Sequence, residues 1–274
     1  MIIIYHASCY DGFCAAWLLH KLFPDADYQP FQYGDEAPDV AGQNVIIADF
    51  SFPESEMIRM QNEAMSFLCF DHHKTVSESV RNLPGVTFDV EKSGARLVWE
   101  YFADDIRAAD GLVRPEPPFQ VKYTEDRDLW RWELSYSREV NAGMRLVEFD
   151  FDAWDRMNFF DLEKAGSVLC RYFDKKAANI AHKSKDVIVS HGVDDLKIPC
   201  VNCADGDMIS LVGEQLAIRE GTPFGMTYFF DGDQFIFSLR SRGNFDVSEV
   251  AKSFGGGGHR NAAGFSRPEM FPAA

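Results

Sequence analysis

Three short apolar runs near the start of the chain constrain its fold most strongly. Ile2–Tyr5, Val45–Phe50 and Ser66–Phe70 are almost continuously apolar, as is typical of strands buried on both faces of a parallel sheet. Helix-spaced apolar residues lie between them, over Gly12–Phe23 and Pro53–Ala64. The alternation predicts an α/β fold whose mostly parallel N-terminal sheet carries helices on both faces.

After about residue 150 the pattern changes. Residues 151–185 have the periodicity of one or two long amphipathic helices, and Asp231-Gly232-Asp233 lies between two strand-like runs as in a hairpin. Arg114–Pro118 holds three prolines and predicts a loop. We therefore predict an N-terminal α/β domain over 1–150, a helical linker over 151–185, and a smaller α/β domain with a mixed sheet over 186–274.

The formal net charge of −16 restricts the partners of the chain. Proteins that bind duplex DNA neutralise many phosphates with Lys and Arg, and this sequence lacks that surplus. A short or small anionic substrate is compatible with the charge, because metal ions and a few local cations can reverse the field within a site. We expect no duplex DNA partner.

Hydrophobic residues make up 46% of the chain, which is typical of a folded protein. No apolar run approaches the roughly 18–20 residues of a membrane span. The start of the sequence lacks the basic residues and cleavage site of a signal peptide, and its six cysteines are scattered. We expect no membrane partner and a reduced, cytoplasmic setting.

Ionisable residues follow each of the three apolar runs. His6 and Asp11 come after the first, Asp49 closes the second, and Asp71-His72-His73 follows the third directly. A single aspartate after a strand is usually a helix cap or turn residue. Three strand ends that deliver Asp and His to one edge of a parallel sheet instead predict a metal site. Mixed Asp and His ligands suit Mn²⁺ or a related divalent ion.

A second signal lies near the C-terminus, where four glycines precede a histidine. Glycines leave backbone N–H groups open to an anion, and the small residues that follow resemble the tight start of a helix, whose N-terminus favours phosphate. Two arginines on the preceding strand can add positive charge. The predicted substrate-binding residues are Arg240, Arg242, Gly255, Gly256, Gly257, Gly258 and His259.

These two motifs resemble those of a known family. Asp71-His72-His73 resembles the signature of the DHH-family phosphoesterases, and Gly255–His259 with Ala262-Ala263-Gly264 resembles the glycine-rich motif of their DHH-associated C-terminal domain. The family includes single-strand exonucleases, nucleases of very short RNA, phosphodiesterases of signalling dinucleotides, phosphatases of adenosine bisphosphate, and inorganic pyrophosphatases. The resemblance implies hydrolysis of phosphate esters or anhydrides with Mn²⁺ or a similar ion.

The resemblance also implies roles for single residues. It assigns one ion to His6 and Asp49 and a second ion to Asp11, Asp49 and His72, so that Asp49 bridges the two. Cys9 is a departure, because the family usually has a carboxylate at this position. A thiolate prefers softer ions such as zinc or iron. Cys9 either ligates a metal, leaves the first site weak so that one ion is held firmly, or only packs.

The family's catalytic motif corresponds to Asp71, His72 and His73. Asp71 would orient a histidine from behind, and His73 would face the substrate phosphate. A later motif supplies one further aspartate to the second ion. Asp126 and Asp128 both fit, because each has an aromatic residue four positions later, and we favour Asp126.

The sequence thus predicts a metal-dependent phosphoesterase that hydrolyses phosphodiester bonds of short single-stranded oligonucleotides or dinucleotides with metal-activated water. A cleft between two domains with a phosphate-holding loop favours such a substrate of limited length. One alternative is a phosphatase of a small nucleotide such as adenosine bisphosphate. Another is an inactive relative that binds nucleotides. An oligomer is compatible with the sequence.

Overall fold

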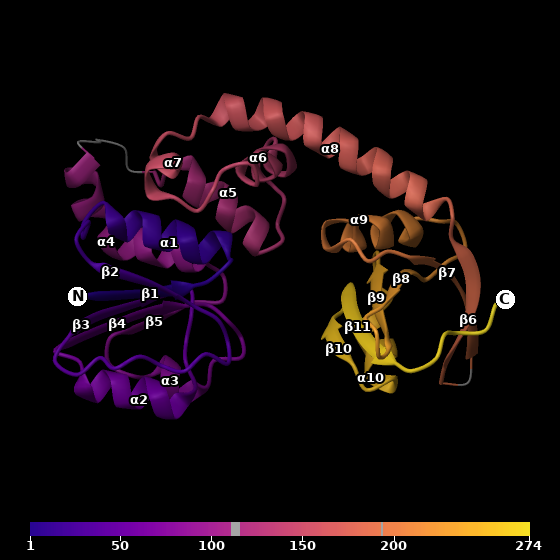
Figure 1. The fold of residues 1–274 in the computed structure, drawn as a ribbon, viewed down its shortest axis with the longest axis horizontal. Helices are drawn as coiled ribbons and strands as arrows, with labels where there is room; N and C mark the ends of the chain where they lie inside the picture. Colours follow the sequence, from indigo (N-terminus) through magenta and orange to yellow (C-terminus); the bar gives the residue numbers. More distant parts are fainter. Residues whose placement is uncertain (111–115, 193) are drawn as a thin grey trace. The chain divides into compact units, whose positions relative to one another are not determined.

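The computed structural model describes residues 1–110, 116–192 and 194–274 (Figure 1). The chain divides into two compact units, Met1–Val168 and Leu169–Ala274. The loop predicted at 114–118 lies partly outside the described residues. Within the described part, no helix is long and apolar enough to span a membrane.

The first unit is built on a five-stranded sheet in the order β2-β1-β3-β4-β5. All neighbouring strands in it are parallel. Helices cover both faces, with α1 and α4 on one side and α2 and α3 on the other (Figure 1). The strands are β1 (Ile2–His6), β2 (Asp27–Phe31), β3 (Asn44–Ala48), β4 (Ser66–Asp71) and β5 (Val86–Phe88). The helices are α1 (Tyr10–His20), α2 (Glu54–Glu63), α3 (Glu78–Arg81) and α4 (Gly94–Asp110), followed by α5 (Phe119–Asp128), α6 (Ser137–Met144) and α7 (Phe151–Asp155).

Burial on both faces explains why the central strands are almost continuously apolar. Ile3 and Phe70 belong to the core beneath α1 and α4, whereas Ile4 and Cys69 belong to the core that includes Met57 of α2. Neighbouring residues of a strand point to opposite faces, so both sides of each central strand must be apolar. The predicted parallel sheet with helices on both faces is confirmed.

Helix α8 (Phe159–Ala181) runs across the boundary between the two units. Together with α7 it accounts for most of the segment 151–185 that the sequence predicts to be helical. The two units divide at residue 168, in the middle of this helix.

The second unit contains a six-stranded sheet in the order β10-β11-β9-β8-β7-β6. Only β7 and β8 pair in parallel, so the sheet is mixed as predicted. The predicted hairpin is the β8–β9 pair. The elements of the second unit after α8 are β6 (Lys185–His191), β7 (Asp194–Asn202), α9 (Gly206–Ala217), β8 (Phe224–Phe230), β9 (Phe235–Ser241), α10 (Val247–Ser253), β10 (Gly257–His259) and β11 (Ala262–Arg267).

The glycine-rich segment differs from the prediction of an open loop that leads into a helix. Gly257–His259 form β10, which pairs antiparallel with β11. A side chain at Gly256 would collide with the backbone of Gly264, and one at Gly258 would come within 2.5 Å of the Cα atom of Ala263. These glycines therefore permit close strand contact, which the composition alone does not distinguish from the tight start of a helix.

This contact predicts different effects for two adjacent glycines. Gly256→Ala should lower the free energy of unfolding of the second unit by about 1–3 kcal/mol, because the methyl group overpacks the strand pair. Gly257→Ala should have little effect, because nothing lies within 4 Å of the added methyl group. Hydrogen–deuterium exchange of peptides from β9 to β11 measures the difference. Equal protection in the two variants would contradict this account of the segment.

Candidate metal centre

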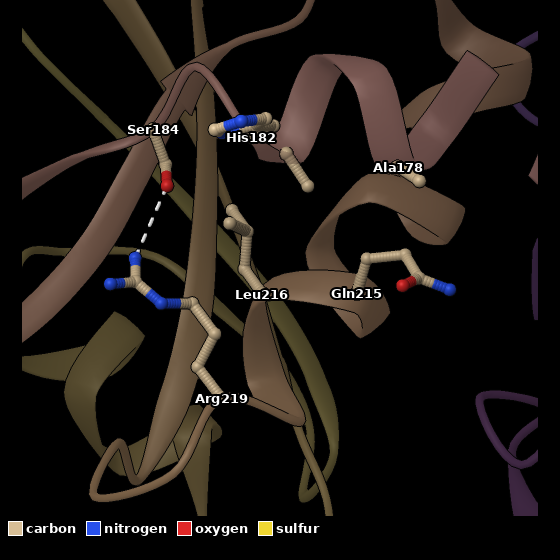
Figure 2. Close-up of a pocket in the computed structure, with 7 residues that line it drawn as sticks. Ala178, His182, Ser184, Gln215, Leu216 and Arg219 are labelled. Atoms are coloured by element: carbon tan, nitrogen blue, oxygen red, sulfur yellow. Dashed lines mark hydrogen bonds between the residues drawn. The ribbon is translucent and has the colours of Figure 1, made fainter. Parts of the chain in front are cut away.

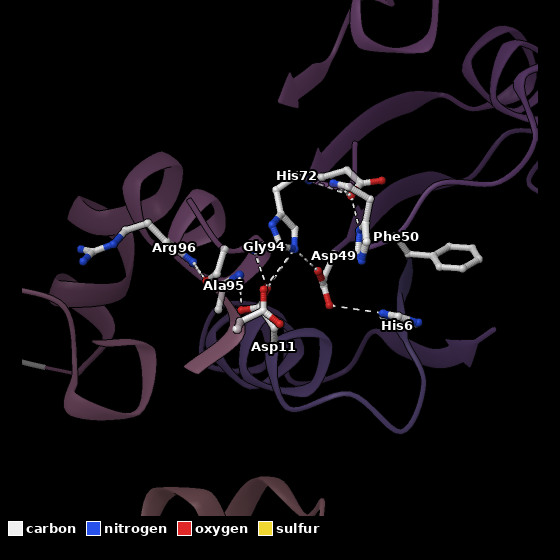
Figure 3. Close-up of polar contacts among 12 residues, drawn as sticks. His6, Asp11, Asp49, Phe50, His72, Gly94, Ala95 and Arg96 are labelled. Carbon is white, nitrogen blue, oxygen red and sulfur yellow. Dashed lines mark hydrogen bonds and ion pairs between the residues drawn. The ribbon is translucent and has the colours of Figure 1, made fainter. Parts of the chain in front are cut away.

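The carboxyl ends of β1, β3 and β4 bring ionisable side chains to one edge of the first sheet. His6, Asp49 and His72 meet there with Asp11 of α1 (Figure 3). Asp128, the last residue of α5, joins them. Three overlapping groups have ligand atoms within 4.8 Å of one another, namely His6–Cys9–Asp49, Asp49–His72–His73 and Asp11–His72–Asp128.

His72 and Asp49 lie at the middle of this cluster. His72 Nε2 is 3.1 Å from Asp49 Oδ1, 3.4 Å from Asp128 Oδ2 and 3.8 Å from Asp11 Oδ2. On its other side, Asp49 Oδ2 is 3.5 Å from His6 Nδ1. Asp49 thus faces two imidazoles with its two oxygens, which is the placement that a bridging carboxylate needs.

The backbone around Asp49 is shaped to present its side chain. Asp49 adopts a left-handed conformation with φ of 57°, which aspartate tolerates better than most residues. Its N–H still donates to the carbonyl of Phe70 at 2.8 Å, so the residue remains fastened to β4. Gly94 packs directly on it, since a side chain there would lie 2.5 Å from Asp49 Cβ.

The N-terminus of α4 holds Asp11. The backbone N–H groups of Gly94 and Ala95 donate to the two Asp11 oxygens at 2.5 and 3.1 Å (Figure 3). The first N–H groups of a helix lack partners within it and favour a negative charge. Arg96, the next residue, makes a paired hydrogen bond to buried Glu125 at 3.0 and 2.9 Å. This support was not predicted from the sequence, where its only signal is the Ser93-Gly94-Ala95 stretch at the start of α4.

Asp71 fixes the backbone of His72 and His73 and the ring of His73. Its Oδ1 accepts hydrogen bonds from the backbone N–H groups of His72 and His73 at 2.7 and 3.0 Å, and lies 2.7 Å from His73 Nδ1. Its Oδ2 accepts a hydrogen bond from Ser51 at 2.5 Å. Because Nδ1 of His73 donates to Asp71, Nε2 of His73 is the nitrogen left for a substrate or an ion.

Several carboxylates lie close together in the cluster, so ionising all of them is unfavourable. Burial, and then the charges of Asp49 and Asp128, raise the pKa of Asp11 well above its usual range. Burial also raises the pKa of Asp128, together with the charge of Asp49. Burial opposes ionisation of Asp49 too, but the neighbouring imidazoles of His6 and His72 hold its pKa below the usual range.

The residues fit a divalent cation. His6 Nδ1 and Asp49 Oδ2 are buried without a hydrogen-bond partner among the described residues, although such atoms are nearly always satisfied in folded proteins. A cation between them would satisfy both atoms and offset the repulsion among the three aspartates. Carboxylate oxygens and imidazole nitrogens are donors that suit Mn²⁺ and related ions.

Cys9 places its sulfur with His6 and Asp49 in the first of the three groups. Burial, and then the charges of Asp49 and Asp11, raise the pKa of its thiol, so the sulfur is protonated without a metal. A coordinating thiol is deprotonated outright. The side chain is therefore positioned to act as a ligand, at the cost of losing its proton.

The two candidate aspartates at the end of α5 have different surroundings. Asp126 accepts hydrogen bonds from the N–H groups of Glu133 and Leu134 at 2.9 and 3.4 Å, and fastens the following loop. Asp128 lies 3.4 Å from His72 and within the third group of ligand atoms. The structure therefore brings Asp128 to the cluster, whereas the sequence favoured Asp126. Their spacing from later aromatic residues is the same, so the sequence could not separate them.

The predicted substrate-binding residues lie in the second unit, where strand register aligns two of them. His259 pairs with Ala262, and Ala262 pairs with Arg240 of β9, so the side chains of His259 and Arg240 share one face of the sheet. The Arg240 guanidinium donates to Ser210 Oγ and to the Leu239 carbonyl, both at 2.8 Å. No described carboxylate forms an ion pair with it. Arg242 follows the end of β9 and is exposed.

Figure 2 shows a separate hollow of about 370 Å³ in the second unit. Its Arg219 donates to Ser184 Oγ at 3.2 Å and lies 3.4 Å from a carboxylate oxygen of Asp186, so its charge is already offset. None of the predicted substrate-binding residues lines it. The lining residues are Ala178, Ala181, His182, Ser184, Gln215, Leu216 and Arg219.

Comparisons with known proteins bear on the C-terminal motif and on the fold. Residues 200–274 match the DHHA1 domain. The chain is 28% identical over 302 residues to uncharacterized protein R106 of Acanthamoeba polyphaga mimivirus, an alignment that covers 97% of this chain and 67% of that protein. An exopolyphosphatase-related protein from Bacteroides fragilis has the same fold, with a TM-score of 0.58 and 14% identity over 98% of this chain and 87% of the other. A pGpG-specific phosphodiesterase, PggH, from Vibrio cholerae aligns with a TM-score of 0.48 and 15% identity over 98% of this chain and 94% of that protein.

Divalent ions should stabilise the first unit. With Mn²⁺ at about 100 times its Kd, binding adds roughly 2.7 kcal/mol to the free energy of unfolding. For a unit of this size the melting temperature should rise by about 5–10 °C. Tryptophan fluorescence reports this unit alone, because all five tryptophans precede residue 155. Asp49→Ala should abolish the Mn²⁺-dependent rise, and a rise retained in that variant would contradict the site.

Asp128→Ala should lose affinity for Mn²⁺, whereas Asp126→Ala should lose stability. Asp128→Ala should weaken Mn²⁺ binding by at least about tenfold, because it removes a donor from the cluster. Asp126→Ala should lower the free energy of unfolding by about 1–3 kcal/mol, because two backbone N–H groups lose their acceptor. Mn²⁺ titration by calorimetry and urea unfolding of both variants separate the two roles. The reverse pattern would assign the ligand to Asp126.

Proposed function

We propose that this chain, whose residues 200–274 match the DHHA1 domain, is a divalent-metal-dependent phosphohydrolase acting on phosphodiester bonds of short oligonucleotides or dinucleotides. The observation that carries the proposal is the convergence of buried aspartates and histidines at one sheet edge, with His6 Nδ1 and Asp49 Oδ2 left without hydrogen-bond partners. An arrangement with this electrostatic cost is expected where chemistry requires it.

The ligand set divides around Asp49. We assign His6, with the sulfur of Cys9 beside it, to one ion, and Asp11, His72 and Asp128 to the other. When bound, such ions make water a stronger nucleophile near neutral pH and neutralise charge on the phosphoryl oxygens. Mn²⁺ is the ion that we expect. The thiol at Cys9 makes the first position the one where a softer ion competes best.

His73 is the residue that we expect to touch the substrate. Burial opposes its protonation, but the hydrogen bond to Asp71 raises its pKa above the usual value for histidine. A protonated His73 whose Nδ1 is held by Asp71 can donate from Nε2 to a phosphoryl oxygen. Its ring lies 4.6 Å from that of His72, so the donor stands beside the metal ligands.

We propose that the second unit binds a phosphate group of the substrate. Arg240 is a partly buried cation without an ion-pair partner among the described residues, and burial lowers its pKa. Arginine donates well to phosphate, and His259 on the same face of the sheet can add a further donor.

A 5′-labelled RNA trimer with Mn²⁺ tests the proposal directly. The wild-type chain should shorten the trimer stepwise to mononucleotides, and Asp71→Ala should not. His73→Ala should lower kcat by about 10²–10³-fold, as expected for the loss of a donor to the transition state. An intact trimer would exclude the oligonucleotide substrate. Adenosine bisphosphate would then be the next substrate to assay, and a Mn²⁺-loaded protein that hydrolyses neither would favour a nucleotide-binding role.

Arg240→Ala should raise KM for the trimer by about 10–150-fold, equivalent to the 1.5–3 kcal/mol of a charged hydrogen bond. Arg219→Ala is the matched control, because this arginine lies in the same unit but already pairs with Asp186. Unequal effects of the two variants on KM support a phosphate subsite at Arg240. Equal effects would show that only the overall charge of the unit matters.

A further inference from the structure

Tyr33 lies against the metal centre although no motif points to it. Its ring centroid is 5.4 Å from that of His6, 5.8 Å from that of His73 and 4.9 Å from that of Phe50. The side chain nevertheless remains 53% exposed. An aromatic ring that touches two histidines of the cluster and still faces solvent is available to a substrate bound there.

The backbone fixes Tyr33 in place. It lies in a turn in which Asp35 N–H donates to the Gln32 carbonyl at 3.1 Å, while the Asp35 carboxylate accepts from Gln32 N–H at 2.7 Å. Gly34 at the third position has φ of 102°, a conformation that glycine adopts readily. Phe50, which is itself buried, packs on the ring with an interplanar angle of 36°. The ring is therefore a preformed surface rather than a mobile side chain.

Single exposed aromatic residues are common on protein surfaces. Tyr33 differs because it is held by a closed turn and by three neighbouring rings, two of which belong to the metal cluster. If Tyr33 served only to pack against its neighbours, its ring would be expected to expose a smaller fraction of its surface. A rigid aromatic face beside a phosphate-binding centre is instead the usual platform for a nucleobase.

The charges around the turn show which part of a substrate this surface can accept. Asp35, Glu36 and Asp39 are exposed next to it and line a hollow of about 700 Å³. Arg59 in that hollow is already paired with Glu56 and Glu63, at 2.8 and 2.7 Å. Further phosphates extending over Tyr33 would be repelled, whereas a neutral base would not.

We propose that Tyr33 stacks on the base of the nucleotide whose phosphate occupies the metal centre, and that it selects nucleotides over polyphosphate. The inference rests on the proposed function, because it takes the phosphate to be bound at the cluster. Tyr33 is thus a specificity-determining residue that contributes binding free energy without adding charge.

Titration calorimetry of two probes with the Mn²⁺-loaded chain tests whether Tyr33 binds the base, and it requires no turnover. The probes are adenosine 5′-monophosphate and ribose 5-phosphate, which has a hydroxyl group at C1 in place of the base. The wild-type chain should prefer the nucleotide by about 5–150-fold, equivalent to the 1–3 kcal/mol of one stacked base. Tyr33→Leu should remove most of this preference and leave ribose 5-phosphate binding unchanged. Tyr33→Phe should keep it.

Tyr172→Leu is the matched control, since Tyr172 is 60% exposed and contacts Phe173 rather than the cluster. An unchanged preference in Tyr33→Leu would overturn the inference. So would an equal weakening of both probes, which would mean that the ring only supports His6 and His73. Loss of the preference in Tyr33→Phe would assign the effect to the hydroxyl group instead. If the RNA trimer stays intact but Tyr33→Leu abolishes the preference, the proposed reaction fails and the base-binding role stands.

Discussion

Repulsion among buried Asp11, buried Asp49 and the more exposed Asp128 is the constraint on which the first unit depends. Asp11 and Asp49 are almost completely buried, and in a medium of low polarity their charges interact far more strongly than in water. The protein offsets part of this cost with the N-terminus of α4 at Asp11 and with His6 and His72 at Asp49. A bound cation would offset the remaining repulsion, and the proposed metal binding would then be linked to the stability of this unit.

Close contact between helices and strands makes this arrangement possible. A side chain at Gly12 would collide with the backbone of His6, and one at Gly94 would meet Asp49. These two glycines let α1 and α4 approach the ends of β1 and β3, so Asp11 and the first N–H groups of α4 reach the cluster. The positions of the ligands therefore follow from how the helices pack as much as from the strand ends that carry them.

The central strands of the parallel sheet could be predicted from the sequence, because burial on both faces leaves a continuous apolar run in each of them. The edge strands lack that signal, since β2 contains Pro30 and β5 is three residues long. The choice between Asp126 and Asp128 depends on the loop after α5, where Trp130 and Trp132 both adopt left-handed backbone conformations. No local pattern predicts such a conformation for tryptophan, and none marks Tyr33 as a neighbour of two histidines distant in sequence.

Because the chain is acidic, the metal cluster, Arg240 and Tyr33 would contribute to substrate binding in different ways. With a formal net charge of −16, the surface repels an anionic substrate at long range, so under the proposed function ions at the cluster would contribute to affinity as well as to chemistry. Arg240 adds one local cation, whose contribution weakens as salt rises. Stacking on Tyr33 involves no net charge and is insensitive to salt. Within the first unit, a bound cation and the ring of Tyr33 would together hold the phosphate and the base of one nucleotide, whereas the net negative charge of the chain disfavours long polyanions.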